Sequence, residues 1–155
     1  AWVPLVAILL TLPGALDAQL QSDSGLTFFE YTVLAGLSGA GSRGLRMSEL
    51  AAAANGSLSR LSQVVTRMEQ RDWVVRSADP DDGRATRVVL RPAGRRAIVD
   101  AAPAHVEHVR RTVFDHLSEA QVQQLRRIAT KVASALPEAS SVLATRARAG
   151  GAPTQ

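Results

Sequence analysis

The fold is decided by residues 47–72, which read MSELAAAANGSLSRLSQVVTRMEQRD. The start of this stretch is rich in alanine, the strongest helix former, and predicts a short helix. The pair Asn55–Gly56 then ends that helix, because glycine readily adopts the left-handed conformation of a helix stop. Ser57 can cap a second helix that continues to about Asp72. Two helices joined by so tight a turn predict a helix-turn-helix.

The second helix has two contrasting faces at about 100° per residue. The face expected to pack on the domain carries Leu58, Leu61, Val64, Val65 and Met68. The opposite face is polar, contains no Asp or Glu, and carries Ser59, Arg60, Gln63, Thr66, Arg67 and Gln70. Such a face suits the major groove of DNA, because phosphates repel carboxylates whereas Arg and Gln reach base edges. The alternative is an ordinary solvent-exposed helix with two arginines.

A β-hairpin is predicted directly after this helix. Val74 and Val75 begin one strand, residues 78–84 are dense in turn formers, and residues 86–91 alternate as a returning strand. Arg84 at the hairpin tip can enter an A·T-rich minor groove, where the negative potential is strongest. Asp82 can hold the Arg84 guanidinium through a charge-assisted hydrogen bond. The alternative is a surface turn with a local ion pair, which stabilises little.

Apolar helices are predicted on both sides of this segment. The first runs to about Gln21 and carries Leu5, Leu9, Leu12 and Leu16 on one face. Thr27 can cap the next helix, and Pro92 opens a long helix that continues to about His116. Ser118 and Gln121 form a capping box for a last helix, which carries Val122, Leu125, Ile128, Val132 and Leu136 on its inner face. The sequence therefore predicts a mainly α fold with a small β-hairpin, that is, a winged helix-turn-helix plus a helical region.

The apolar N-terminus, Trp2 to Leu16, has a second interpretation as a targeting segment. No Lys or Arg precedes it, so the charged region of a signal peptide is missing. It is also shorter than the roughly 20 residues that a membrane span needs. We therefore predict a packed helix, a protein without a membrane partner, and a cytoplasmic location. Because the chain does not begin with Met, the sequence leaves open whether residues precede Ala1.

Composition narrows the function further. The 155 residues suffice for one domain, the net charge is +4, and Lys131 is the only lysine, so arginine carries almost all the positive charge. The absence of cysteine excludes disulfides, thiolate metal sites and thiol redox sensing. His105 and His108 are spaced as metal ligands on a helix can be, but zinc needs three or four ligands and no others can be assigned. We find no catalytic motif, and we predict no enzyme, no metal and no cofactor.

The quoted stretches resemble the MarR family of bacterial regulators. The resemblance rests on residues 47–51, 57–61, 65–69 and 79–84, together with residues 103–106, Val109, Arg110 and Phe114 of the long helix. It implies a homodimer whose terminal helices interlock, with two winged lobes on a palindromic double-stranded DNA operator. One departure is Arg91, where many members have Thr or Ser, which puts the start of the long helix in doubt.

These inferences define the domains and the candidate DNA-binding residues. Residues 1–21 and 92–137 are predicted to form a helical dimerisation region, because the two terminal helices carry more apolar surface than one lobe can bury. Residues 27–91 are predicted to form the DNA-binding lobe, and residues 138–155 a flexible tail. The candidate DNA-binding residues are Ser57, Ser59, Arg60, Ser62, Gln63, Thr66, Arg67, Asp82, Arg84 and Arg87.

The resemblance also implies an effector, since small phenolic or carboxylate compounds often bind between the dimer helices and the DNA-binding lobe in this family. In this chain the junction would be lined by Leu16, Phe28, Phe29, Tyr31, His105 and Val109. The alternative is that the aromatic residues are plain core. The predicted function is thus a ligand-responsive repressor. The competing interpretation is a degenerate winged-helix interaction module without a DNA target, against which Arg60, Arg67 and Arg84 argue.

Overall fold

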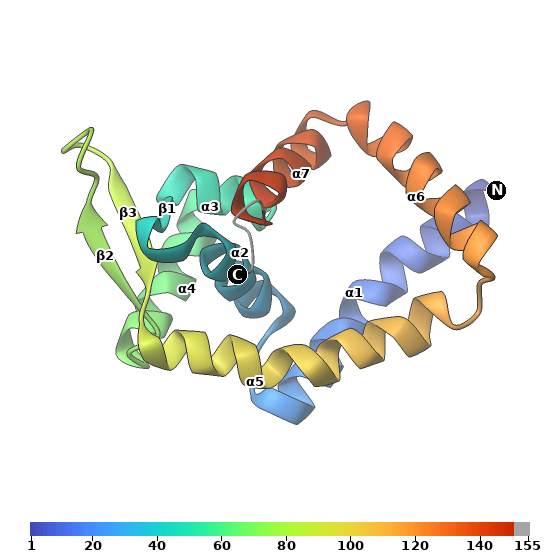
Figure 1. The fold of residues 1–155 in the computed structure, drawn as a ribbon, viewed down its shortest axis with the longest axis horizontal. Coiled ribbons are helices and arrows are strands. Elements are labelled where there is room, and N and C mark those ends of the chain that lie inside the picture. The colour runs from blue at the N-terminus through green and yellow to red at the C-terminus, as the bar shows by residue number, and fades with distance from the viewer. Residues whose placement is uncertain (151–155) are drawn as a thin grey trace.

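Helices dominate the chain, and a small antiparallel sheet projects from one end (Figure 1), which confirms the predicted fold class. The computed structural model describes the backbone of residues 1–150 and the side chains of all of these except 145, 146 and 148–150. The elements in chain order are α1 (Trp2–Ser24), α2 (Phe28–Ala40), a 3₁₀ turn (Gly41–Arg43), β1 (Leu45–Arg46), α3 (Met47–Ala53), α4 (Leu58–Gln70), β2 (Val74–Ala78), β3 (Thr86–Leu90), α5 (Pro92–Val109), a π-helical turn (Arg110–Phe114), α6 (Glu119–Ser134) and α7 (Pro137–Gly150).

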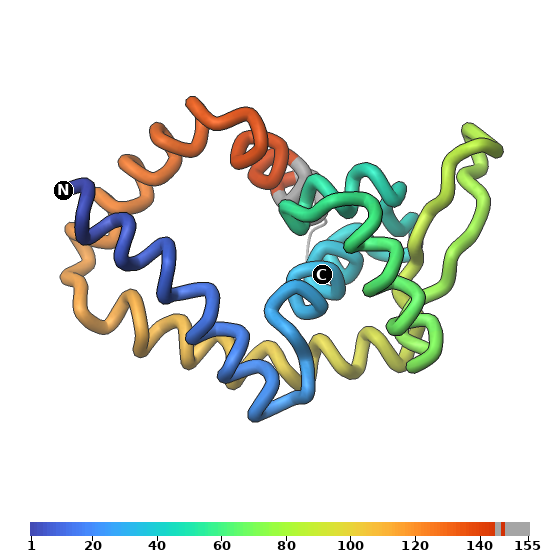
Figure 2. Tube along the Cα trace, turned by 180° about the vertical axis from the view of Figure 1, so that it is seen from behind, coloured from blue at the N-terminus to red at the C-terminus, as the bar shows by residue number. Residues whose placement is uncertain are grey.

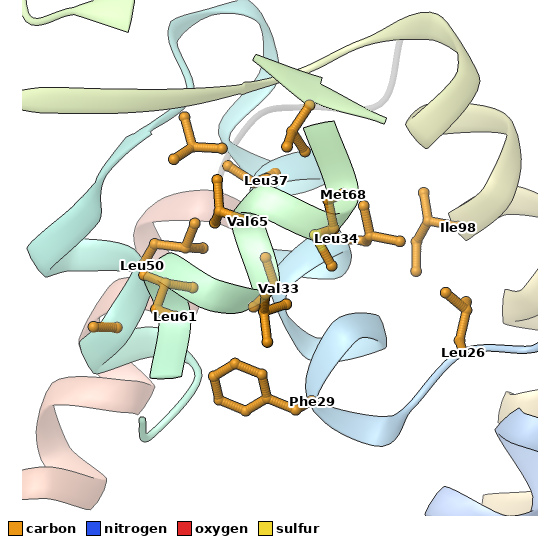
Figure 3. Close-up of a cluster of buried hydrophobic side chains, with 14 of the residues drawn as sticks. Leu26, Phe29, Val33, Leu34, Leu37, Leu50, Leu61, Val65, Met68 and Ile98 are labelled. Carbon is orange, nitrogen blue, oxygen red and sulfur yellow. The ribbon is translucent and has the colours of Figure 1, made fainter. Parts of the chain in front are cut away.

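The hydrophobic core lies where α2, α3, α4 and the first half of α5 meet (Figure 3). Burying one side chain of leucine size stabilises the folded state by about 1.5–3 kcal/mol, so this cluster fixes the two helices of the helix-turn-helix against α2. Leu58 is an exception to the predicted apolar face, since it is 55% exposed at the first turn of α4. The fully buried side chains of these elements include Val33, Leu34, Leu37, Leu50, Leu61, Val65 and Met68.

The turn between α3 and α4 departs from the prediction in detail. Asn55, and not Gly56, adopts the left-handed conformation, with φ of 49°. Gly56 is needed for a different reason, because a Cβ atom there would lie 2.6 Å from Cε2 of Phe29. The turn is therefore tight because α2 packs directly against its backbone. Ser57 caps α4 as predicted, its Oγ accepting a hydrogen bond of 3.2 Å from the backbone N–H of Arg60.

The sheet has three strands where the sequence predicted a two-stranded hairpin. Its order is β1-β3-β2, and both neighbouring pairs are antiparallel. Strand β1 is too short to show any periodicity in the sequence, so it escaped prediction. Gly44 permits the pairing of β1 with β3, since its φ is 64° and a Cβ there would lie 2.2 Å from the carbonyl oxygen of Val88. The β2–β3 hairpin extends beyond the helices as a wing (Figure 1).

The predicted caps of two later helices are present. Thr27 Oγ1 accepts a hydrogen bond of 3.1 Å from the backbone N–H of Glu30, which starts α2. At the start of α6, Gln121 Oε1 accepts a bond of 2.8 Å from the backbone N–H of Ser118. Helix α5 begins at Pro92 as predicted, although Arg91 supplies no side-chain cap.

The remaining helices form an open frame beside the core, seen from opposite sides in Figures 1 and 2. Helix α1 packs along α5, and α7 packs against α2 and α3. The predicted flexible tail is therefore wrong for residues 138–150. The physical reason is that Pro137 and Glu138 make a favourable first helical turn, which tertiary contacts then stabilise. Residues 151–155 of that predicted tail lie outside the described residues.

Helix α1 is longer than predicted and ends at Gly25, whose φ of 65° is the left-handed conformation of a helix stop. Among the helices of residues 1–150, α1 is the one whose length and apolar composition would suffice to cross a membrane. Core helices of soluble proteins and signal sequences share this property. Its C-terminal half is anchored in the protein, since Leu16 and Leu20 are buried. Its N-terminal half leaves most of its apolar side chains exposed.

Candidate DNA-binding surface

The face of α4 that points away from the core is polar and exposed, as predicted. No carboxylate lies on it, because the single acidic residue of α4, Glu69, is half-buried and pairs with Arg76 of β2. Positive charge without carboxylates is what the phosphates and base edges of duplex DNA require. The residues exposed on this face are Ser59, Arg60, Ser62, Gln63, Thr66, Arg67 and Gln70.

Helix α2 restrains both arginines of this face. The Arg60 guanidinium carbon lies 4.2 Å from the centroid of the Phe29 ring, a cation–π contact. The Nε atom of Arg67 lies 4.0 Å from Oε1 of Glu30, a buried carboxylate whose Oε2 accepts the backbone N–H of Thr27 at 2.9 Å. This role of Phe29 and Glu30 was not predicted, although the capping-box spacing from Thr27 to Glu30 is visible in the sequence. Both arginines remain exposed while their orientations are restricted.

Arg84 lies at the exposed tip of the wing, as predicted. Asp82 does not hold its guanidinium, however, because Asp82 Oδ1 accepts the backbone N–H of Arg84 at 3.1 Å. The predicted bond between the two side chains is therefore wrong, since the short Asp82 side chain closes the turn locally instead. Within residues 1–150 the Arg84 guanidinium makes no hydrogen bond or ion pair, so it is available to an anion.

A buried carboxylate, Asp79, organises the base of the wing. Its Oδ1 accepts the backbone N–H groups of Asp81 at 2.9 Å and Asp82 at 3.1 Å. Its Oδ2 lies 2.8 Å from Nε of Arg46 and 2.6 Å from Nε of Arg87. The hydrogen bond from Arg46 foremost, then the backbone N–H of Asp81 and the two arginine charges, hold the pKa of Asp79 far below its usual range, against the opposing effect of burial. The sequence predicted a turn here but not a buried anion.

Arg87 belongs to this buried cluster and not to the DNA-binding surface. It is 6% exposed, and its Nη1 donates to the backbone carbonyls of Arg43 and Gly44, each at 3.4 Å. The prediction that Arg87 contacts DNA is therefore wrong. The cause is the extra strand β1, which makes β3 the central strand, so that the adjacent residues Arg87 and Val88 are both buried.

The predicted effector junction contains a cavity of about 560 Å³ between α1, α2 and the turn before α4. Phe28 and Phe29 line it as predicted, whereas Asp17, Thr32 and Arg60 were not foreseen as its lining. The predicted residues His105 and Val109 line a separate cavity of about 280 Å³ on α5. The single predicted pocket is thus divided into two. Because Arg60 also belongs to the exposed face of α4, the larger cavity reaches the candidate DNA-binding surface.

Of the other predicted pocket residues, Leu16 is buried and Tyr31 packs on His105, with 4.3 Å between ring centroids. Nδ1 of His105 lies 3.0 Å from Oε1 of Gln19 on α1. Burial first, and the nearby His108 second, lower the pKa of His105, which favours the neutral ring. Because Gln19 Oε1 can only accept, Nδ1 is the donor in this hydrogen bond. Across residues 1–150 no group of three or more His, Cys, Asp or Glu side chains is placed to hold a metal ion.

Apolar side chains are exposed along α1 and α6. Ile8 is 53% exposed and Ile128 is 62% exposed, and α6 buries none of its side chains. A soluble monomer rarely exposes so extensive an apolar surface. A cavity of about 490 Å³ at this surface is lined by Ile8, Thr11, Leu12, Ala15, Thr112, Val113, Leu117, Gln121 and Leu125.

Comparisons with known proteins relate this surface to a family. The sequence profile of the MarR family matches residues 24–85, which run from the end of α1 to the wing loop. None of the curated protein sequences matches significantly. Among solved structures, the chain is similar to Sco3205, a MarR family transcriptional regulator from Streptomyces coelicolor whose structure was determined in complex with DNA. The identity is 38%, the alignment covers 88% of this chain and 85% of that chain, and the TM-score is 0.82.

Two further solved structures extend the comparison. AbsC, a MarR family transcriptional regulator from Streptomyces coelicolor, is 34% identical, with 87% of this chain and 90% of that chain covered and a TM-score of 0.81. CouR from Rhodococcus jostii RHA1, bound to p-coumaroyl-CoA, is 27% identical, with 86% of this chain and 90% of that chain covered and a TM-score of 0.71.

Proposed function

Because the chain belongs to the MarR family and is a DNA-binding transcriptional regulator, we propose that it is a cytoplasmic repressor that binds a palindromic operator as a homodimer and releases it on binding a small molecule. The observation that carries this proposal is the exposed, carboxylate-free face of α4 beside the wing-tip cation Arg84. In this proposal α4 enters the major groove and Arg84 enters the flanking minor groove.

The proposal divides the chain between two tasks. Residues 27–91 contact DNA, with Ser59, Arg60, Ser62, Gln63, Thr66 and Arg67 in the groove. Ser57 and Asp82 act indirectly, because their side chains cap α4 and close the wing turn. Residues 1–21 and 92–137 join two subunits through the exposed apolar faces of α1 and α6. The twofold symmetry of such a dimer is the reason to expect a palindromic operator.

The DNA-binding proposal is tested by selecting bound duplexes from a random pool and measuring affinity against salt. We expect two half-sites about 10 base pairs apart. Each phosphate neutralised contributes about 0.9 to the slope of log K against log salt, so six contacts give a slope of about −5. A flat salt response, or equal affinity for every duplex, would contradict the proposal and favour the alternative of an interaction module without a DNA target.

The effector proposal rests on the cavity of about 560 Å³ that Arg60 lines. Its walls combine the Phe28 and Phe29 rings with the Asp17 carboxylate and the Arg60 guanidinium, a composition that suits an aromatic acid or phenol. The similar protein CouR binds an aromatic CoA ester, which supports the class of ligand. A ligand that engages Arg60 would withdraw this cation from DNA. Such a ligand shifts the equilibrium between free and DNA-bound protein only by the difference between its affinities for these two states.

We expect a member of a panel of aromatic acids and phenols to release the selected duplex at millimolar concentration or below, whereas peroxide does not, because the chain has no cysteine. A variant that fills the cavity, Gly14→Leu, should weaken this response and keep DNA affinity, since a Cβ at Gly14 meets nothing within 4 Å. Ala18→Leu, an exposed position on the same helix, is the matched control. Rapid release by peroxide, with no response to any compound, would refute the mechanism.

A further inference from the structure

Arg76 of β2 crosses from the wing to the exposed face of α4. Its backbone N–H donates to Oε1 of Glu69 at 3.0 Å, and its Nη1 pairs with Oε2 of the same carboxylate. Its Nη2 donates to the backbone carbonyl oxygen of Ser62 at 2.9 Å and to Thr66 Oγ1 at 3.2 Å. One half-buried guanidinium thus ties the wing to two residues of the face that lies opposite the core.

These contacts decide what Thr66 offers to DNA. Its hydroxyl has one proton, which is donated to the backbone carbonyl oxygen of Ser62 at 3.0 Å. The hydroxyl oxygen of Thr66, Oγ1, also accepts the hydrogen bond from Arg76. The hydroxyl of Thr66 thus both donates and accepts a hydrogen bond within the protein, although Thr66 is exposed. The γ-methyl group is therefore the part of the side chain left to face outward.

Ser62 differs from Thr66 in this respect. Its Oγ lies 3.4 Å from Nη2 of Arg76 and accepts a weak hydrogen bond, and among the described side chains and backbone its hydroxyl proton has no acceptor, so it can donate. The two hydroxyl residues therefore present different chemistry on one helix face. Ser62 presents a donor, which suits a phosphate or a base acceptor, and Thr66 presents a methyl group.

We propose that Thr66 recognises the C5-methyl group of a thymine through its own methyl group, and that Arg76 is the positioning residue that holds Thr66 in this orientation. Apolar contact with the thymine methyl is an established mode of major-groove recognition. The inference rests on the proposed insertion of α4 into the major groove. The inference adds to the proposed DNA-binding function a base preference for Thr66. The polarity of this side chain alone would suggest that it recognises a base through a hydrogen bond.

The test replaces each thymine of the selected duplex by deoxyuridine, which lacks the methyl group and keeps the hydrogen-bonding edges. For the parent protein we expect one position per half-site at which affinity falls about fourfold, and about 15-fold when both half-sites are substituted. Thr66→Val removes the hydroxyl but carries a methyl group at both γ positions, so it presents a methyl group without the positioning bond from Arg76 and should retain both the affinity and the deoxyuridine effect. Thr66→Ser should bind both duplexes equally weakly.

The outcomes separate this inference from the proposed function. If no sequence is selected at all, DNA recognition itself is refuted. If sequences are selected but deoxyuridine has no effect at any position, the methyl contact is refuted. If Thr66→Val weakens binding while Thr66→Ser does not, the methyl contact is refuted and the hydroxyl is the reader.

Arg76→Met supplies the test of positioning, because it keeps much of the side-chain length and removes every side-chain donor, while the backbone N–H that bonds Glu69 remains. We expect the base preference at the methyl-reading position to broaden while preferences elsewhere in the half-site remain. A purely structural role would lower affinity equally for all sequences and lower the melting temperature with it. Uniform loss of that kind would overturn the role of Arg76, and the Thr66 variants test the methyl contact independently of it.

Discussion

Replacing Ile8 and Ile128 by aspartate is expected to yield a folded monomer whose affinity for the two-half-site duplex is about 100-fold or more below that of the parent. Both side chains are more than half exposed, at 53% and 62%, so the charges replace surface and not core of the single chain. In the proposed dimer the same positions would be buried, where an unpaired carboxylate is strongly unfavourable. Sedimentation velocity and binding titrations measure the two effects.

The physical reason for the large loss is effective concentration. A dimer that has docked one lobe holds the second lobe near its half-site, whereas a monomer must bind each half-site separately. These substitutions test the dimer better than removal of residues 1–21 does, because that deletion also removes Leu16 and Leu20, which are buried in the folded chain. Val99→Asp, at a side chain that is 59% exposed on α5, is the matched control. A double variant that stays dimeric and binds like the parent would refute the proposed interface.

Much of this fold is readable in the sequence because the decisive signals are local. The polar and apolar faces of α4 depend only on its helical period, and Ser57, Thr27 and Ser118 cap helices through contacts within three residues. The elements that escaped prediction depend on contacts far apart in the chain. Strand β1 exists because Leu45 pairs with Val88, and α7 is held by α2 and α3.

In the candidate DNA-binding surface, too, the features that depend on local sequence were predictable and those that depend on contacts between separate elements were not. The exposure of Arg60, Arg67 and Arg84 follows from their places on a helix face and at a loop tip. The burial of Arg87 and the contacts of Arg76 with α4 do not follow from such local positions, because both depend on how the wing packs against other parts of the chain. Alternation along β3 could not distinguish an exposed arginine from one that faces a buried carboxylate on a central strand.

Substituting Asp79 by alanine is expected to lower the melting temperature by roughly 10 °C, the effect of removing one partner from a buried ion pair in a chain of this size. The Asp79 side chain is fully buried, and that of Arg87 is 7% exposed, so the Arg87 guanidinium would be left without its counter-ion. Arg46 is less affected, since its side chain is 35% exposed and can turn to solvent. The backbone N–H groups of Asp81 and Asp82 also lose their acceptor, which loosens the wing that carries Arg84.

Asp81→Asn removes an equal charge from the same loop at an exposed position, so it should change the melting temperature by only about 1–2 °C. The double variant Asp79→Ala with Arg87→Met should recover much of the loss, because replacing both partners of a buried pair by apolar groups is far less harmful than removing one. Failure of Asp79→Ala to destabilise the protein, or equal destabilisation by Asp81→Asn, would show that the cluster does not hold the wing.

The lowered pKa of Asp79 adds a dependence on pH whose sign is fixed. Because this pKa is lower in the folded than in the unfolded protein, the carboxylate stabilises the fold fully above its unfolded value of about 3.9. That stabilisation declines as the pH falls below about 4, since the unfolded chain then binds a proton at Asp79 that the folded, ion-paired carboxylate does not bind. Thermal unfolding measured between about pH 3 and pH 6 should therefore show a steeper acid-side loss for the parent than for Asp79→Asn. Parallel curves for the two proteins would mean that Asp79 is not the anion that ties Arg46 and Arg87 to the wing.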